Sequence, residues 1–229
     1  MDVGIPQSTA NGLMMALVCI VAATVLGSFL IGSIPFGYIV GRLFYRTDIR
    51  REGSGNIGAM NALRALGKGG AAAVLLLDGL KGFVPTLWAT HFFADRLDIE
   101  GLPAANQMMA AIVAGAAVLG HCFSPWLRFR GGKGVATSFG AIFALCWPAG
   151  IVAVLGWIAG AAATRYSSVG SMFGSILAIV ALWIFTRAVP QTGYGVFAAL
   201  LILLKHRGNI ARLRAGTEGP ISFGQRGRP

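Results

Sequence analysis

The residues best suited to chemistry lie at 120–137, GHCFSPWLRFRGGKGVAT, where cationic side chains adjoin a glycine-rich turn. Glycines let backbone N–H groups approach an anion closely because no Cβ stands in the way. Arg128, Arg130 and Lys133 add charge, and their cationic groups bind phosphate through charge-assisted hydrogen bonds. The segment therefore predicts a phosphate site, and contact of the same cations with lipid headgroups is the alternative.

This segment is not a nucleotide-binding P-loop. Leu127 stands where that motif needs its first glycine, and Gly134 stands where Ser or Thr should follow the lysine. The 8 acidic residues of the chain are scattered, without the paired carboxylates that Mg²⁺-dependent transfer requires. A metal-free site of amides, hydroxyls and cations remains. Such a site stabilises charge developing on oxygen, which suits acyl transfer better than phosphoryl transfer.

A second polar segment, RREGSGNIGAMNALRALGKGG at 50–70, combines glycines with short amides, a serine and an arginine. Small residues of this kind form loops that wrap a polar ligand and donate hydrogen bonds to it. A solvated turn is the alternative, since Gly, Ser and Asn are common in turns. The candidate ligand-binding side chains are Ser54, Asn56, Asn61 and Arg64.

Two later segments add hydroxyls, amides and further charge. The first, TRYSSVGS at 164–171, contains Arg165, Ser168 and Ser171, although serines in membrane helices often bond only to their own backbone. In the second, KHRGNIARLRAGTEGP at 205–220, a helix would place His206, Asn209 and Arg212 on one face. Glu218 is the one acidic residue there, and a basic tail beside the membrane is the alternative.

The composition places these segments in a membrane protein. Of 229 residues, 55% are hydrophobic and 12% charged, with a mean hydropathy of +0.70. Long apolar runs of this kind predict an all-α polytopic membrane protein. Glycine is frequent, as close helix packing in lipid requires. Candidate membrane helices occupy the runs 12–40, 69–93, 104–122, 135–147, 149–163, 169–186 and 189–204.

The basic residues predict the orientation of these helices. Lys and Arg concentrate in four segments, which the positive-inside rule places in the cytoplasm, whereas the acidic loop at 94–103 suits the outside. This pattern requires two short spans within 135–163, turning near Trp147–Pro148, and hence seven helices. The N-terminus is then external and the C-terminus cytoplasmic. A single membrane domain, 1–229, presents active-site segments at about 42–68, 120–137, 164–171 and 205–229.

Two features inside the apolar runs break the pattern. The sequence GSIPFG at 32–37 predicts a kink in the first helix. Asp78 and Lys81 are charges within hydrocarbon, which tend to face a cavity or one another, and their spacing permits a salt bridge. This pair and the kinked helix also permit a small transporter or channel for an organic anion. The gathering of polar motifs on one side of the membrane favours an enzyme instead.

Together the motifs resemble the acyl-phosphate-dependent glycerol-3-phosphate acyltransferases of bacteria, the PlsY family. The resemblance covers nearly the whole chain, in a fixed order. It rests on GSIPFGYIVGR at 32–42, GSGNIGAMNALR at 53–64, DGLKG at 78–82, GHCFSPWLRFRGGKGVAT at 120–137, TRYSSVGS at 164–171 and KHRGNIARLRAGTE at 205–218. Met60 departs from the family pattern, which usually has Thr there, and we exclude it from the site.

The resemblance implies transfer of an acyl group from acyl phosphate to the 1-hydroxyl of glycerol-3-phosphate, in the bacterial inner membrane with the active site facing the cytoplasm. The products are lysophosphatidic acid and inorganic phosphate, in the first acylation step of phospholipid synthesis. It implies no cofactor, no metal and no nucleic-acid partner, and a functional link to the enzyme that makes acyl phosphate. Neither residues nor resemblance predicts an oligomeric state.

The resemblance also implies residue roles. The catalytic residues are expected to be Ser54, Arg64, Lys133, His206 and Asn209. Substrate binding is assigned to Asn56, Asn61, Arg128, Arg130, Gly131, Gly132, Gly134, Arg165, Ser168 and Ser171, with the glycine-rich turn on the phosphate of glycerol-3-phosphate. Structural roles fall to Asp78, Lys81 and Glu218. Either His206 or a substrate phosphate oxygen is expected to act as the general base.

Overall fold

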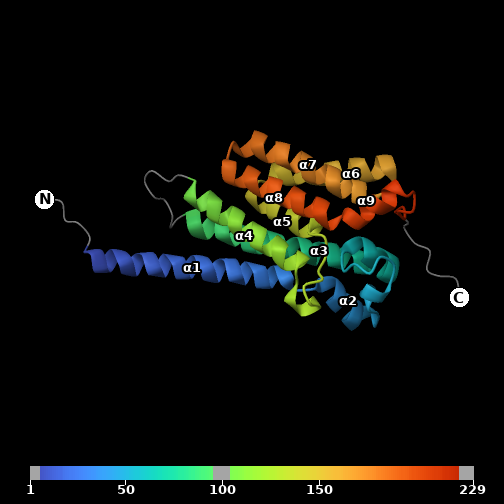
Figure 1. Ribbon diagram of the computed structural model, residues 1–229, viewed down its shortest axis with the longest axis horizontal. Helices are drawn as coiled ribbons and strands as arrows, with labels where there is room; N and C mark the ends of the chain where they lie inside the picture. The colour runs from blue at the N-terminus through green and yellow to red at the C-terminus, as the bar shows by residue number, and fades with distance from the viewer. Residues whose placement is uncertain (1–5, 95–103, 222–229) are drawn as a thin grey trace.

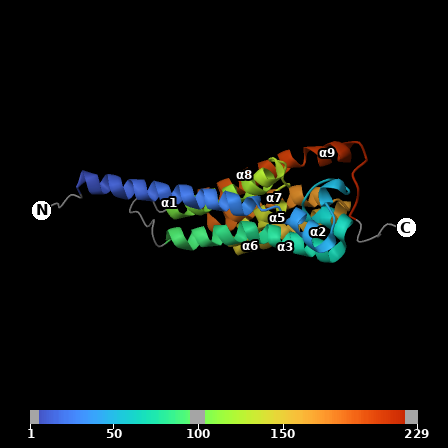
Figure 2. The same ribbon diagram turned by 90° about the horizontal axis from the view of Figure 1, so that it is seen from below.

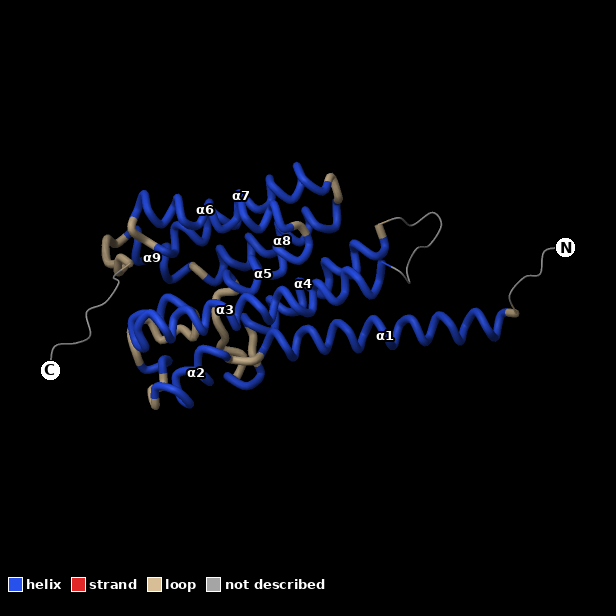
Figure 3. Tube along the Cα trace, turned by 180° about the vertical axis from the view of Figure 1, so that it is seen from behind, coloured by secondary structure: helices blue, strands red, loops and turns tan. Residues whose placement is uncertain are grey.

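The computed structural model describes residues 6–94 and 104–221, and within these ranges the regular elements are helices joined by short loops (Figures 1 and 3). The predicted external loop falls almost wholly in 95–103, and the end of the basic tail in 222–229, outside the described residues. The elements are α1 (Gln7–Ser33), α2 (Phe36–Tyr45), η1 (Ile49–Arg51), α3 (Ala59–Ala94), α4 (Ala105–Cys122), η2 (Pro125–Leu127), α5 (Val135–Leu145), α6 (Trp147–Thr164), α7 (Ser167–Thr186), α8 (Val189–Lys205) and α9 (Arg207–Arg214).

The predicted all-α membrane architecture is confirmed. Among the described residues, five helices, α1, α3, α4, α6 and α7, are long and apolar enough to cross a bilayer, and α5 and α8 are shorter apolar helices. These seven helices correspond to the seven predicted runs. The start of α1 and the end of the described chain, beyond α9, lie at opposite ends of the bundle (Figures 1 and 2). This arrangement is what an odd number of crossings requires.

The first apolar run divides into two helices, as the GSIPFG motif predicted. Helix α1 ends at Ser33, and Pro35 precedes α2, because proline cannot continue the hydrogen bonding of a helix. Helix α2 is amphipathic: Val40 packs into the protein, whereas Leu43 and Phe44 are exposed. A short helix with this pattern suits the membrane–water interface.

The predicted turn between two short helices is also confirmed. Helix α5 ends at Leu145, Cys146 is extended, and Pro148 lies in the first turn of α6. With 11 residues, α5 is about 16 Å long and too short to cross a bilayer alone. It packs against α3, α4 and α6, so its backbone is enclosed mainly by protein. Helix α5 therefore lies inside the bundle, and α6 leads the chain back after the turn at Cys146.

Glycines bring the helices into close contact. A Cβ on Gly140 of α5 would lie 2.1 Å from the carbonyl oxygen of Gly79 in α3. A Cβ on Gly120 of α4 would lie 2.1 Å from the carbonyl oxygen of Phe29 in α1. Neither distance is sterically possible, so only glycine permits these approaches. Membrane helices associate through such small-residue contacts because lipid offers no hydrophobic driving force between them.

A buried ionic contact links three parts of the bundle. The Lys81 ammonium lies 2.7 Å from the Asp78 carboxylate, as the i,i+3 spacing predicted, and donates a hydrogen bond of 2.8 Å to the carbonyl of Ile34. The imidazole Nδ1 of His121, on α4, lies 3.6 Å from the same carboxylate. Because charges in hydrocarbon require partners, this cluster fixes α3 against the α1–α2 break and the end of α4.

Gly140→Ala should destabilise the protein by about 1–3 kcal/mol, because the added methyl group forces α5 away from α3. Thermal unfolding of the purified protein in detergent measures the change. Gly27→Ala is the matched control, since a Cβ at Gly27 meets nothing within 4 Å. Equal unfolding midpoints for the two variants would contradict the proposed contact.

Candidate functional site

Residues from the four predicted polar segments meet at one end of the bundle. The Lys133 ammonium donates a hydrogen bond of 2.5 Å to the Asn209 side chain. Asn209 donates 2.6 Å to the Glu218 carboxylate, which also accepts a 3.0 Å bond from Ser168. We call Lys133, Ser168, Asn209, Arg212 and Glu218 the Glu218 cluster. Arg64, from the first segment, borders it by donating a 3.4 Å bond to the carbonyl of Gly219.

Glu218 is the centre of this cluster. Its second oxygen accepts a 2.7 Å bond from Arg212, so its carboxylate contacts three side chains from α7 and α9. Burial opposes ionisation of Glu218, but the hydrogen bonds from Asn209, Arg212 and Ser168 outweigh it and lower the pKa of this carboxyl group. Of the three residues predicted to share one helix face, Asn209 and Arg212 do so, because both side chains reach Glu218 from α9, whereas His206 precedes that helix.

Lys133 belongs to this cluster, and the charge of Arg64, near the start of α3, also acts on it. Burial lowers its pKa from 10.5 to about 8, with Arg212 and Arg64 acting in the same direction and Glu218 opposing. The ammonium group therefore has less hydration than an exposed lysine and few protein acceptors. An anion placed beside it would replace the lost water and stabilise the charge.

The first polar loop is organised by its own amides. The Asn61 side chain accepts a 2.9 Å bond from the Ser54 N–H and donates to the carbonyls of Ile49 and Asn56. Asn56 in turn accepts a 2.8 Å bond from the N–H of Gly58. These bonds shape the loop that presents Ser54. The bonding capacity of Asn61 is therefore largely used within the loop.

The glycine-rich turn packs tightly on His121. Gly132 donates a 3.0 Å bond to the His121 carbonyl, and a Cβ at Gly132 would lie 2.1 Å from the imidazole Nε2. A Cβ at Gly131 would lie 2.0 Å from the same carbonyl, and Gly134 has φ 85°, which favours glycine. The three glycines are thus required by packing as well as by any approach to an anion. They hold the turn that carries Lys133 against His121.

His206 is buried at the junction of α8 and α9. Its Nδ1 lies 2.8 Å from the carbonyl oxygen of Ile202, so the neutral ring donates through Nδ1 and keeps Nε2 as an acceptor. Burial and the nearby charge of Lys133 lower its pKa to about 4. The imidazole is therefore neutral at physiological pH.

Two predicted residues have other partners. The Ser171 hydroxyl donates 2.8 Å to the carbonyl of Ser167 in its own helix, the alternative considered for this segment. Arg165 ends α6 in a left-handed conformation, and its carbonyl accepts a bond from the N–H of Ile221. Neither side chain has a contact with the Glu218 cluster among the described residues. Their assignment to substrate binding stays a prediction.

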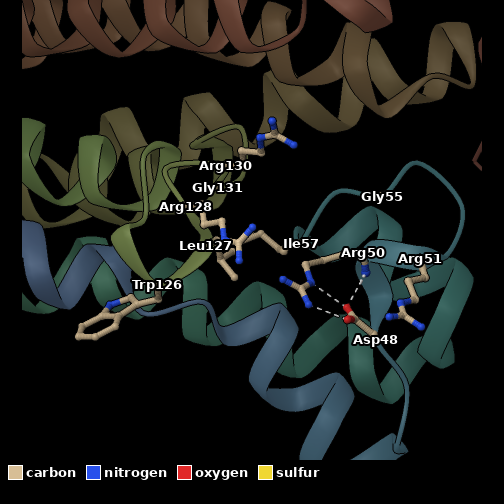
Figure 4. A pocket seen from close by; sticks show the side chains of 10 residues that line it. All are labelled: Asp48, Arg50, Arg51, Gly55, Ile57, Trp126, Leu127, Arg128, Arg130 and Gly131. Atoms are coloured by element: carbon tan, nitrogen blue, oxygen red, sulfur yellow. Dashed lines mark hydrogen bonds and ion pairs between the residues drawn. The ribbon is translucent and has the colours of Figure 1, made fainter.

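Arg128 and Arg130 line a separate pocket of about 700 Å³ between the loops after η1 and η2 (Figure 4). We call it the basic pocket. Arg50, in its wall, donates bonds of 2.9 and 2.7 Å to the Asp48 carboxylate. These bonds outweigh burial and lower the pKa of Asp48 to about 2. The lining is Asp48, Arg50, Arg51, Gly55, Ile57, Trp126, Leu127, Arg128, Arg130 and Gly131.

The Asp48–Arg50 pair was missed by the sequence analysis. Its signal is the pattern of an acidic residue two positions before a basic one in RTDIRRE, which resembles an ordinary solvated turn. Only the fold shows that this turn faces the loop of Arg128. No group of three or more His, Cys, Asp or Glu side chains that could hold a metal ion occurs among the described residues.

The sequence matches known proteins over most of its length. The family model described as glycerol-3-phosphate acyltransferase matches residues 13–216. The glycerol-3-phosphate acyltransferase of Gluconobacter oxydans is 43% identical over 88% of this chain and 93% of its own. That of Rhodopseudomonas palustris strain BisB5 is 45% identical over 88% of this chain and 95% of its own.

Two solved structures are also similar. The glycerol 3-phosphate form of PlsY, an integral membrane glycerol 3-phosphate acyltransferase, superposes with a TM-score of 0.80 at 35% identity, covering 88% of this chain and 96% of that one. The lysophosphatidic acid form superposes with a TM-score of 0.78 at 33% identity, covering 89% of this chain and 96% of that one. Sequence family, relatives and fold agree, and the chain belongs to the glycerol-3-phosphate acyltransferase family, PlsY.

Proposed function

We propose that the protein transfers a fatty acyl group from acyl phosphate to the 1-hydroxyl of glycerol-3-phosphate, giving lysophosphatidic acid and inorganic phosphate. The observation that carries this proposal is Lys133: a partly dehydrated ammonium group near Arg64, with the Asn209 side chain as its hydrogen-bond acceptor. Such a group binds a phosphate strongly. The relatives' name and the glycerol 3-phosphate form of PlsY support the choice of acceptor.

In the proposed reaction, the 1-hydroxyl oxygen attacks the carbonyl carbon of acyl phosphate. The bond between that carbon and the bridging oxygen breaks, and inorganic phosphate leaves. Acyl phosphate is already activated, so the protein contributes mainly orientation and stabilisation of charge. Lys133 and Arg64 hold the anionic groups. The hydroxyl of the exposed Ser54 donates a 3.3 Å bond to Asn61 in the free protein and turns to donate to them when substrate binds.

The proton of the attacking hydroxyl passes to an oxygen of the departing phosphate. His206, whose pKa is about 4, is too weak a base for efficient proton abstraction near neutral pH, where an optimal base has a matching pKa. Its free Nε2 instead accepts a hydrogen bond that orients the acceptor hydroxyl. Asn209 and Ser168 hold the Glu218 carboxylate, which keeps Lys133 and Arg212 in place.

This reaction takes place at the cytoplasmic face of the bacterial inner membrane, without a metal ion. The basic residues at 42–68 and 205–221 support that orientation through the positive-inside rule. The enzyme that makes acyl phosphate would then supply the donor from the same compartment.

Purified protein in detergent should release inorganic phosphate and form lysophosphatidic acid when given acyl phosphate and glycerol-3-phosphate. Phosphate release and the lipid product are measured together, with excess EDTA present to test metal independence. Omission of glycerol-3-phosphate is the control. Product formation only from an acyl thioester donor, or loss of activity in EDTA, would overturn the corresponding part of the proposal.

The kcat/KM for glycerol-3-phosphate should fall above about pH 8, the pKa of Lys133 in the free protein. Below that pH the ammonium is charged and binds the phosphate. Above that pH the neutral amine loses this attraction, so kcat/KM should decrease by up to about tenfold per pH unit. Lys133→Arg keeps the charge and should lack this decrease. The same decrease in both proteins would show that another group titrates.

Glu218→Gln should lower the unfolding midpoint and reduce kcat/KM by at least about tenfold, because Arg212 and Lys133 lose a charged partner worth about 1.5–3 kcal/mol. Steady-state rates and thermal unfolding measure both effects. Glu52→Gln removes an exposed carboxylate from the first loop and is the control. An active, equally stable Glu218→Gln protein would rule out the central role of this carboxylate.

A further inference from the structure

The basic pocket has an excess of positive charge without partners. The Asp48 carboxylate forms ion pairs with the guanidinium groups of Arg50, at 2.7 Å, and Arg42, at 3.9 Å. Its negative charge is therefore compensated within these pairs. Within the described residues, no carboxylate lies within salt-bridge distance of Arg51, Arg128 or Arg130. Three guanidinium groups around one pocket repel one another. A bound anion would remove this repulsion and accept several of their hydrogen bonds.

Two of these arginines, Arg128 and Arg130, lie in a loop whose backbone is conformationally strained. Arg128 and Phe129 have φ values of 52° and 61°, the left-handed region that side chains with a Cβ rarely adopt. The N–H of Phe129 donates 2.8 Å to the carbonyl of Ser124, whose hydroxyl donates 2.6 Å to the carbonyl of Ser33. The loop is thus anchored to the end of α1, and this anchoring keeps Arg128 and Arg130 beside the pocket.

Exposed apolar side chains place the pocket beside the membrane surface. Trp126, in the pocket wall, is 64% exposed although its indole N–H donates 2.8 Å to the Ser33 hydroxyl. Leu43 and Phe44 of the neighbouring amphipathic helix α2 are 72% and 76% exposed. Tryptophan and amphipathic helices concentrate at the headgroup level of membranes. A pocket there meets the phosphates of lipid headgroups.

The basic pocket and the proposed reaction site around the Glu218 cluster take different residues from the same two loops. Gly55 lines the pocket, whereas its neighbour Ser54 bonds to Asn61 at the start of α3. Gly131 lines the pocket, whereas Lys133 bonds to Asn209. The two anion-binding surfaces therefore adjoin without sharing a side chain.

We propose that the basic pocket binds the phosphate headgroup of an anionic phospholipid of the surrounding bilayer, with Arg51, Arg128 and Arg130 donating to its oxygens. The acyl chains of this lipid lie along Trp126 and the exposed face of α2. Such a lipid is a bound ligand of the fold rather than a reactant. The proposal is independent of the acyl donor used at the Glu218 cluster.

The test is lipid-dependent stabilisation of the purified full-length protein in a neutral detergent. Thermal unfolding is followed while dioctanoyl phosphatidylglycerol is added, with dioctanoyl phosphatidylcholine and inorganic phosphate in parallel. Phosphatidylglycerol should raise the unfolding midpoint to a plateau. Phosphatidylcholine should have little effect, and inorganic phosphate should require at least about tenfold higher concentration, because it lacks the chains that bind beside Trp126.

Substitutions then locate the lipid. The double variant Arg128→Gln/Arg130→Gln should need at least about tenfold more phosphatidylglycerol for half of the stabilisation, since it loses charged hydrogen bonds. Arg51→Gln should shift the concentration in the same direction, and it tests the proposal should the double variant not fold. Arg214→Gln, at the exposed end of α9, is the matched control and should respond like the wild type.

Lys133→Ala separates this proposal from the proposed reaction. It should lose acyl transfer yet keep the response to phosphatidylglycerol. Loss of the response in Lys133→Ala would place the lipid at the Glu218 cluster and overturn the proposal. An unchanged response in both Arg51→Gln and the double variant would overturn it too. Equal half-saturating concentrations for inorganic phosphate and the lipid would show a pocket for free phosphate only.

Discussion

A carboxylate and an ammonium group lie 2.7 Å apart within the helix bundle, Asp78 and Lys81, each less than 4% exposed. Removing either partner would leave one charge alone in a medium that solvates it poorly, which is far costlier than removing the pair. Lys81 also bonds to the carbonyl of Ile34, which the break before Pro35 frees from helical bonding. The break in the first apolar run and the charge in α3 therefore stabilise each other.

His121 connects this ionic contact to the glycine-rich turn that carries Lys133. The imidazole lies against Asp78 on one side and against Gly132 on the other, and its backbone carbonyl accepts the Gly132 N–H. Helix α5 begins immediately after this turn and is held against α3 by the Gly79–Gly140 approach. A rigid base beneath the turn allows Lys133 to keep its position although it lies in a loop. Catalytic groups on loops need such support.

Much of this architecture follows from patterns that depend on neighbours in sequence. A long apolar run forms a helix, and a proline such as Pro35 or Pro148 limits where that helix begins or ends. The i,i+3 spacing of Asp78 and Lys81 likewise allowed their contact to be predicted. The gathering of four polar segments followed from the charge distribution. The separation of Arg128 from Lys133 could not be predicted in this way. The left-handed backbone at 128 and 129 turns Arg128 toward the basic pocket, whereas Lys133 bonds to Asn209. The periodicity of apolar residues in the sequence contains no information about a left-handed turn of this kind.

The partners of Glu218 come from far apart in the chain, and all of them precede it in sequence. Proteins are synthesised from the N-terminus, so α1 to α8 are complete before the residue that connects Ser168, Asn209 and Arg212 exists. Until then, Arg64, Lys133 and Arg212 form an uncompensated positive surface. A nascent chain that has not yet reached Glu218 therefore has its membrane helices but lacks the carboxylate that joins α7 to α9.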